Sequence, residues 1–388
     1  LFANKSSKCR KIHNIANSVI ILDEVQMLPL DYLKPCIAML QELVDGYSAS
    51  VVLCTATQPA LDSFFSDKES IKELCPRMEE QFRFFKRVNY QNLGKIRQED
   101  LLERLKNEKN ALCIVNTKKA AQMICKELHG EGIYHLSTSM YPKHRKRVLK
   151  VIRERLESDE KCIVISTSLV EAGVDLDFIR VYRQIAGLDS MIQAAGRCNR
   201  EGKRKWSESI FYIFDLEEAK VVQSQRQQID VSKGILQDYS DISDLKAITD
   251  YFTRLYHYRG ASLDKKKIMD EFQKMECNFA KVAKEFKLIE ENTKTIFINR
   301  EPEAEKLLQE LRFKRVTKER MRKAGQYCIQ VYDNEKSENS FFDRLNGSGM
   351  IRPISEEMQD FYELAEGEQY SEEYGLDFSL EDGLALFV

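Results

Sequence analysis

The sequence predicts an α/β protein in which two domains built on parallel sheets are followed by a helical connector and a small mixed domain. Short apolar runs alternate with stretches of amphipathic helical spacing, which is typical of strands joined by helices. Polar and small residues follow several of these runs, at the strand ends where open parallel sheets bind ligands. The 388 residues are enough for two or three domains.

The rest of the chain is organised around the apolar run 19–22, which is followed directly by Asp23 and Glu24. We expect this run to be a buried parallel strand. Mg²⁺ prefers oxygen ligands and usually keeps several waters. Asp23 could therefore hold the metal through water, and Glu24 could orient a water for attack on a phosphoryl group. The alternative is a strand-to-loop turn, since Asp-Glu after an apolar strand is common by chance.

The first domain is expected over residues 1–92 and contains a βαβ unit. Thr55 and Thr57 follow its second strand, and their hydroxyls could face the two carboxylates; the alternative is a hydroxyl-rich turn. The other expected elements are a helix with Asp31 as its N-cap, the second strand and an edge strand, over residues 31–46, 50–54 and 82–90.

The second parallel domain is expected over residues 93–218. Its expected strands cover residues 111–115, 133–136, 161–165, 178–183 and 209–214. Its expected helices cover residues 97–108, 118–130, 141–157 and a stretch from about residue 189 that includes Arg200.

A charged helical connector is expected over 219–285 and a mixed domain over 286–388, with strands near 295–299 and 327–332. Tyr327 and Tyr332 are interpreted as sheet core.

One signature of the second domain follows a strand and reads Ser166-Thr-Ser-Leu-Val-Glu-Ala-Gly-Val-Asp-Leu-Asp177. Hydroxyls such as that of Thr167 can grip a nucleic-acid phosphate. Gly173 can take a positive φ without strain. Asp175 could accept a hydrogen bond from a ribose or from a nearby arginine.

The other signature is Gln193-x-x-Gly-Arg197-x-x-Arg200. The two arginines are three residues apart, so on a helix they would share one face. Two guanidiniums on one face suit a polyphosphate, and as arginine fingers they would stabilise charge on the transferring γ-phosphoryl group. The alternative is a helix pinned by surface salt bridges.

Charge and cysteine usage limit the function further. Sixty basic and 62 acidic residues give a net charge of −2, so any nucleic-acid surface must be a local patch. Basic clusters over 143–155 and 312–323 could track a single strand, or they could be solvated faces. The ten cysteines form no C-x-x-C pair and fit a reducing cytoplasm. No run is apolar enough for a membrane span.

The motifs follow the order of motifs II to VI of superfamily 2 helicases, which the chain resembles over residues 18–202. The runs Asp23-Glu-Val-Gln-Met-Leu-Pro29, Thr55-Ala-Thr-Gln-Pro-Ala-Leu61 and Glu171-Ala-Gly-Val-Asp-Leu-Asp-Phe178 are similar to the helicase portion of the type I CRISPR-associated helicase–nuclease family. This resemblance implies two RecA-like domains that use ATP and Mg²⁺ to translocate on DNA. It also implies single-stranded DNA and an RNA-guided surveillance complex as partners, and a cytoplasmic location.

The resemblance also implies roles for individual residues. It implies a catalytic set of Asp23, which is also the metal ligand, with Glu24, Gln26, Arg197 and Arg200. It implies nucleotide contacts from Gly173, Asp175 and Gln193, and nucleic-acid contacts from Thr55, Thr57, Asn116, Thr117 and Thr167.

Three departures from the family pattern stand out. Position 26 is Gln where many members carry His, which puts its link to the Thr-Ala-Thr turn in question. The sequence contains no G-x-x-x-x-G-K-[ST] loop, so we expect an N-terminally truncated chain, an incomplete first domain and no ATPase activity in isolation. No histidine is followed by Asp, so we expect the nuclease metal site to lie elsewhere.

Two other functions stay open at this point. One is a fragment of an RNA helicase or a restriction-type translocase. The other is a non-catalytic module that binds nucleic acid or a partner without turning over ATP.

Overall fold

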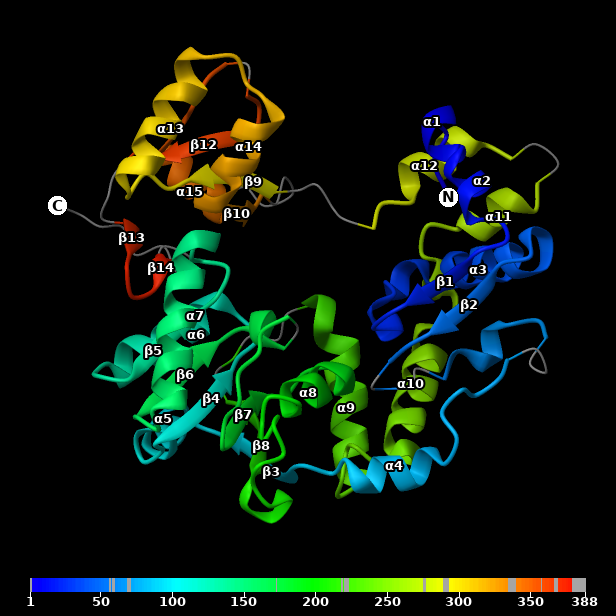
Figure 1. Ribbon diagram of the computed structural model, residues 1–388, viewed down its shortest axis with the longest axis horizontal. Helices are drawn as coiled ribbons and strands as arrows, with labels where there is room; N and C mark the ends of the chain where they lie inside the picture. The colour runs from blue at the N-terminus through cyan, green and yellow to red at the C-terminus, as the bar shows by residue number, and fades with distance from the viewer. Residues whose placement is uncertain are drawn as a thin grey trace. The chain divides into compact units, whose positions relative to one another are not determined.

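The computed structural model describes residues 2–55, 57, 60–67, 71–171, 173–217, 219, 223–274, 277–288, 293–333, 340–356, 358–365 and 369–378. Ala56, Gln58, Pro59 and Ala172 of the sequence motifs lie outside the described residues. The chain forms two compact units (Figure 1). Unit 1 comprises Leu1–Lys86, Ala186–Gln193 and Gln223–Glu290, and unit 2 comprises Arg87–Ile185, Ala194–Val222 and Glu291–Val388.

The predicted βαβ unit is present in unit 1. β1 (Val19–Leu22) pairs in parallel with β2 (Ser50–Leu53), and α3 (Leu33–Tyr47) joins them. Apolar residues at helical spacing bury one face of α3, which explains why this segment folds as an amphipathic helix; they are Leu33, Ile37, Leu40 and Leu43.

The prediction that β1 is a buried strand is wrong. Val19 and Ile21 are each 66% exposed, while the alternate residues are half-buried. The described part of this sheet has two strands, and α3 covers one face, so the side chains on the other face remain open.

Asp31 is not the N-cap of α3. It lies in the 3₁₀ turn Leu30–Tyr32, and the capping position falls on Tyr32 without a side-chain cap. The Asp31 carboxylate instead forms ion pairs with Arg259 at 3.2 Å and Lys265 at 2.8 Å, which ties this turn to the helical segment. Sequence patterns identify a capping residue type but not a distant ion-pair partner.

Apart from 3₁₀ turns, the other regular elements that the structure describes in unit 1 are helices. They are α1 (Ser6–Cys9), α2 (Lys11–Ile15), α4 (Met78–Phe84), α9 (Arg226–Asp238), α10 (Leu245–Arg259), α11 (Ile268–Phe272) and α12 (Phe279–Glu285). Ile248, Phe252 and Leu255, which recur at helical spacing, are buried on one face of α10. The predicted edge strand over 82–90 is wrong in its first half, because Glu79, Glu80 and Gln81 favour the helix α4.

Unit 2 contains a six-stranded parallel sheet in the order β3-β8-β7-β4-β6-β5. The strands are β3 (Asn89–Ile96), β4 (Asn110–Ile114), β5 (Ile133–Leu136), β6 (Cys162–Ser166), β7 (Arg180–Gln184) and β8 (Ile210–Leu216). The helices are α5 (Gln98–Lys106), α6 (Lys118–Leu128), α7 (Pro142–Glu157) and α8 (Leu188–Ala195), the last of which spans the unit boundary. The central strands β4 and β6 are completely buried, as expected for parallel strands covered on both faces.

The C-terminal part of unit 2 has a mixed four-stranded sheet in the order β10-β9-β12-β11. Its elements are β9 (Thr293–Phe297), α13 (Pro302–Phe313), α14 (Lys318–Ala324), β10 (Cys328–Tyr332), α15 (Phe341–Gly347), β11 (Ile351–Pro353) and β12 (Phe361–Leu364). Tyr327 is buried as predicted, but Tyr332 at the end of β10 is 72% exposed, so its placement in the core was wrong.

A short hairpin of β13 (Tyr370–Ser371) and β14 (Gly375–Leu376) follows this sheet. In Figure 1 it lies beside α7. No helix in the described part of the chain is long and apolar enough to cross a membrane.

Candidate functional site

The end of β1 presents two exposed carboxylates, Asp23 and Glu24. Glu24 has a φ of 53°, which is uncommon for a residue other than glycine. Asp23 Oδ1 accepts the backbone N–H of Glu24 at 3.0 Å, which helps to hold this turn. Strained backbone that the surrounding structure holds in place is typical of functional sites.

Glu24 begins a chain of hydrogen bonds. The side-chain amide of Gln26, which is buried, donates to Glu24 Oε2, and the carbonyl end of the same amide accepts from the hydroxyl of Thr55. Gln193 also donates to Glu24 Oε2, at 3.3 Å. Gln26 therefore makes the link to the Thr-Ala-Thr turn that the sequence left in question.

The turn after β2 holds the Thr55 end of this chain. Thr55 Oγ1 accepts the backbone N–H of Thr57 at 3.0 Å and lies 2.9 Å from the carbonyl oxygen of Thr57. Its single proton serves either that carbonyl or Gln26. Thr57 is fully buried, and its own hydroxyl has no hydrogen-bond partner among the residues that the structure describes.

A divalent cation at this edge would have few protein ligands. The described residues contain no group of three or more His, Cys, Asp or Glu side chains that could hold a metal ion. Mg²⁺ is commonly held by one or two carboxylates plus waters and substrate phosphates, so the exposed pair of Asp23 and Glu24 fits that mode of binding.

The two arginines of the Gln193 signature do not lie on one helical face, as the sequence suggested. Helix α8 ends at Ala195, before either arginine. Arg197 is buried and donates to the backbone carbonyls of Val170, from Nε at 2.8 Å, and Glu171, from Nη2 at 2.5 Å. Arg197 thus holds the Ser166–Asp177 signature in place through these two carbonyls.

Arg200 has a different environment. Its side chain is 42% exposed, and Nε donates to Asp175 at 2.5 Å. Asp177 accepts the backbone N–H of Arg200 at 2.7 Å and pairs with Arg204 at 3.1 Å. Of the two partners that the sequence allowed for Asp175, this structure has the arginine. Gly173 has a φ of 70°, a conformation that a glycine adopts without strain.

Two of the residues predicted to contact nucleic acid, Asn116 and Thr117, make hydrogen bonds within the fold. Asn116 accepts from Arg183 at 2.6 Å and donates to the carbonyl of Ile185 at 2.9 Å. Thr117 is the N-cap of α6 and accepts the backbone N–H of Ala120 at 3.2 Å. Thr167 precedes a 3₁₀ turn and makes no capping bond there.

The sequence analysis missed a buried ion pair beneath these residues. Arg183 Nε lies 2.9 Å from Glu171 Oε1, and their side chains are 2% and 7% exposed. The available signal was that Arg183 falls within an expected strand of a parallel sheet, where a buried charge needs a partner.

The basic helix α7 is partly neutralised by carboxylates, some of which come from the C-terminal part of the chain. Lys143 pairs with Glu301 and Glu303, each at 2.7 Å, and Arg147 pairs with Glu301 and Glu372. Elsewhere on the helix, Arg155 pairs with Glu131 and Glu160 and Lys150 with Glu154. Most of this helix is therefore a paired face.

We refer to residues 369–378 as the C-terminal strap. The His144 Nδ1 atom lies 2.6 Å from the Tyr370 hydroxyl, and Nε2 lies 3.0 Å from the carbonyl oxygen of Glu372. A carbonyl can only accept, so Nε2 carries the ring proton and Nδ1 accepts from Tyr370. Burial lowers the pKa of His144, which favours this neutral form.

Acidic residues also accompany the second basic cluster. Lys314 pairs with Glu310 at 3.0 Å and Lys323 with Glu319 at 2.9 Å. Arg312 pairs with the buried carboxylate of Glu363. Ion pairing thus reduces the free positive charge in both regions that could have tracked DNA.

Comparison with known proteins adds evidence on the fold and on the family that the chain resembles. Residues 107–203 match the family model described as the C-terminal part of the CRISPR-associated nuclease/helicase Cas3. A curated relative of that name from Methanothermobacter thermautotrophicus is 25% identical over 244 residues, which cover 57% of this chain and 29% of the relative.

Solved structures show the same fold. The crystal structure of T. fusca Cas3 with ATP matches with a TM-score of 0.57 and 13% identity, over 89% of this chain and 51% of that one. A chain in a structure titled as a CRISPR RNA-guided surveillance complex before nicking matches with a TM-score of 0.57 and 12% identity, over 89% of this chain and 53% of that one.

These matches confirm two predictions from the sequence: the α/β fold class and the resemblance to the helicase portion of the Cas3 proteins. The chain spans less than a third of the curated relative and about half of the matched structures.

Proposed function

We propose that this chain supplies the helicase part of an ATP-dependent DNA translocase that unwinds target DNA for degradation in type I CRISPR interference. ATP and Mg²⁺ are its proposed cofactors, and single-stranded DNA and an RNA-guided surveillance complex are its proposed partners. The proposed location is the cytoplasm, which agrees with ten free cysteines. The similarity to Cas3 helicases supports this proposal.

The observation that carries the proposal is the hydrogen-bond chain from Gln193 through Glu24 and Gln26 to Thr55. It joins side chains from three of the motifs that the sequence singled out. A structural turn would not need an exposed carboxylate that receives two amide donors on one oxygen. A carboxylate that must hold a water in one orientation does need such fixed partners.

We assign roles to the carboxylates on this basis. Asp23 would bind Mg²⁺ through water, and the bound ion would neutralise charge on the phosphates. Glu24 would orient the attacking water with the oxygen that Gln26 and Gln193 leave free. Gln26 would transmit the state of this site to the Thr-Ala-Thr turn, because its one amide contacts both ends.

The arginines divide into two roles in this proposal. Arg200 is the exposed one, and exchange of its contact with Asp175 for a phosphate would free it to act as an arginine finger. Arg197 is a positioning residue, since its guanidinium is committed to two backbone carbonyls.

Glu24→Gln tests the proposal in the full-length protein that carries this sequence. Loss of a positioned general base typically costs on the order of 10²–10⁴ in rate. We expect that loss in phosphate release with single-stranded DNA, and unchanged DNA binding. The matched control is Glu79→Gln, because Glu79 is an exposed carboxylate on α4.

Two outcomes would count against this function. An ATPase rate in Glu24→Gln equal to that of Glu79→Gln would remove the assigned base. Stimulation of ATP hydrolysis in the unmodified protein by RNA but not by DNA would indicate an RNA helicase instead of a DNA translocase.

A further inference from the structure

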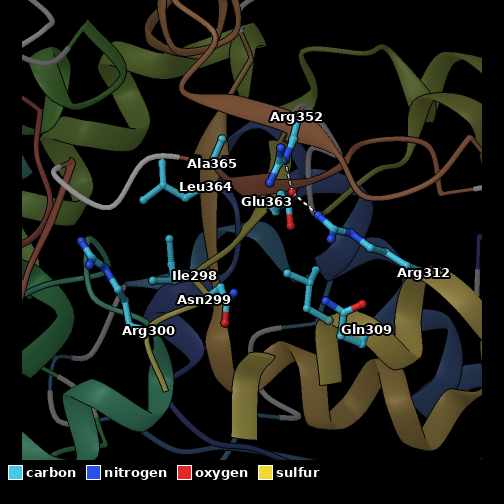
Figure 2. Close-up of a pocket in the computed structure, with 10 residues that line it drawn as sticks. Ile298, Asn299, Arg300, Gln309, Arg312, Arg352, Glu363, Leu364 and Ala365 are labelled. Carbon is cyan, nitrogen blue, oxygen red and sulfur yellow. Dashed lines mark hydrogen bonds and ion pairs between the residues drawn. The ribbon is translucent and has the colours of Figure 1, made fainter. Parts of the chain in front are cut away.

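The C-terminal domain contains a polar pocket that none of the helicase motifs reaches. Its volume is about 140 Å³. Figure 2 shows its lining, which comes from β11, β12, α13 and the segment after β9. The polar side chains of the lining are Asn299, Arg300, Gln309, Arg312, Arg352 and Glu363.

Glu363 organises two of the arginines. Its side chain is 2% exposed, and Arg312 and Arg352 both pair with the same carboxylate oxygen, Oε1. In Figure 2 the two guanidiniums approach this carboxylate from different elements, α13 and β11. A single carboxylate therefore fixes two guanidiniums at the wall of the pocket.

The pocket carries excess positive charge. Three arginines and one glutamate line it, which leaves a net charge of about +2. Arg300 has a backbone partner rather than a charged one in the described residues, because its Nη2 donates to the carbonyl of Tyr370 at 3.0 Å.

Many donors remain available for a ligand. A guanidinium has about five N–H groups. In the described part of the chain, Arg352 uses Nε and Arg312 uses Nη2 to contact Glu363. Their other N–H groups, and the side-chain amides of Asn299 and Gln309, could donate hydrogen bonds to an oxyanion.

We propose that this pocket binds a phosphate group with monoester charge. Such a group carries about −1.5 to −2 at neutral pH, which matches the excess charge, and arginine forks suit its oxygens. A structural ion-pair cluster would need only enough arginine to balance Glu363, whereas this one has two guanidiniums beyond that balance.

Size restricts what else can enter. The 140 Å³ of the pocket is well above the roughly 10–15 Å³ that a cavity needs in order to hold one water molecule. It is well below the roughly 300–1,000 Å³ of sites that enclose a drug-sized ligand. The pocket therefore accommodates a phosphate group and leaves any attached sugar and base outside. The group could be inorganic phosphate or the terminal phosphate of a nucleic-acid strand.

The test uses the complete chain and two kinds of probe. Isothermal titration with inorganic phosphate measures the shared chemistry. Fluorescence anisotropy with single-stranded oligonucleotides, with and without a terminal phosphate, measures the strand end. We expect Arg352→Gln to weaken phosphate binding by about tenfold or more, because hydrogen bonds to charged groups are among the strong ones.

The control is Arg226→Gln, which makes the same change in net charge at an exposed arginine on α9, outside the pocket lining and outside both basic clusters. If Arg352→Gln lowers the melting temperature, Arg300→Gln is the second variant, since both ion pairs of Glu363 remain in it.

Each outcome decides the proposal. Phosphate binding that is lost in the pocket variants and kept in Arg226→Gln supports it. A preference for phosphorylated oligonucleotides that disappears with the same variants assigns the site to strand ends, and phosphate binding without that preference assigns it to free phosphate. No phosphate binding, or equal binding in all variants, overturns the proposal. None of these results depends on ATP hydrolysis, so failure here leaves the proposed helicase function untouched.

Discussion

At the residue scale, Gln26 stands where many members of the family carry a histidine. Its amide makes the hydrogen bonds to Glu24 and Thr55 that a histidine ring could make. A neutral histidine has one donor nitrogen and one acceptor nitrogen. The Gln26 amide offers the same pair, and it uses the donor on Glu24 and the acceptor on Thr55. The sequence showed the departure from the family pattern but not its compensation, which depends on where the Thr55 hydroxyl lies in space.

This equivalence gives the first prediction. In the full-length protein, Gln26→His should retain the stimulation of ATP hydrolysis by single-stranded DNA, while Gln26→Leu should lose most of it, on the order of 10²-fold as for other misplaced catalytic groups. The measurement is the ratio of phosphate release with and without DNA. Gln237→Ala, an exposed glutamine on α9, is the control. Equal ratios in Gln26→Leu and the control would show that Gln26 does not couple DNA binding to ATP hydrolysis.

The two arginines should also separate by experiment. Arg197→Ala leaves two backbone carbonyls without their donor, which costs about 1–3 kcal/mol in a buried setting, so the melting temperature should fall. Arg200→Ala removes an exposed ion pair worth about 0–1 kcal/mol, so stability should hardly change.

Catalysis should show the reverse pattern. Loss of an arginine finger typically costs roughly 10³–10⁵ in rate. Thermal unfolding and ATPase assays on both full-length variants check this pair. An unchanged ATPase rate in Arg200→Ala would contradict a catalytic role for Arg200 and leave only a structural role, the ion pair with Asp175.

At the element scale, the sequence predicted strands and helices where periodicity was strong and misplaced those that depended on local stops. Apart from the end of α8, the strands and α-helices from residue 98 to residue 216 were expected within a few residues of their observed bounds. The end of α8 was not, because the Gln193 signature reads as continuous helical spacing and the stop comes from the contacts that Arg197 makes.

The C-terminal strap is an element that no pattern in the sequence predicted. It docks through backbone atoms: Gln122 donates to the carbonyls of Tyr374 and Leu376, and the Ser139 carbonyl accepts the N–H of Leu376. Gly375 is required there, since a Cβ atom would come within 2.4 Å of the Ser139 carbonyl oxygen. Contacts between segments this far apart in the chain leave no periodic signal in either one.

The strap gives a prediction on pH. Burial lowers the pKa of His144 from its ordinary value of 6.5, so the unfolded chain takes up this proton at higher pH than the folded one. The stability that the folded state gains from the buried, neutral His144 is therefore complete above about pH 6.5. It declines as the pH falls toward the pKa of His144 in the folded chain. Protonation would also place a donor opposite the Tyr370 hydroxyl.

Thermal unfolding of the chain between pH 7.5 and pH 5 measures this effect. We expect the difference in melting temperature between wild type and His144→Gln to shrink as the pH falls. His129→Gln is the matched control, since His129 is exposed at the end of α6. Parallel curves for wild type and His144→Gln would show that the histidine does not titrate with unfolding.

At the scale of the whole molecule, composition predicted a near-neutral chain with local basic patches, but it could not say which cations were already paired. That distinction depends on the C-terminal segment, whose glutamates Glu301, Glu303 and Glu372 meet α7. The same limit applies to the candidate site. Its residues could be named from motif order, whereas the partners of Asn116 and Arg197 required the fold.

The remaining free charge on α7 gives the last prediction. Lys146 and Arg153 are exposed and form no ion pair among the described residues, and their spacing of seven places them on one face of the helix. If α7 contributes to a DNA track, these two residues rather than Lys143 and Arg147 make the phosphate contacts. Each contact to a single strand contributes about 0.7 to the slope of log K against log salt.

The double variant Lys146→Ala with Arg153→Ala should therefore bind single-stranded DNA more weakly at low salt and reduce that slope by about 1.4. Lys143→Ala removes a cation that two glutamates already neutralise, so its slope should stay near that of wild type. Anisotropy titrations of the complete chain at several salt concentrations provide the slopes. If Lys143→Ala lowers the slope and the double variant does not, the paired face would be the DNA-contacting one, and the ion pairs with Glu301 and Glu303 would have to open when DNA binds.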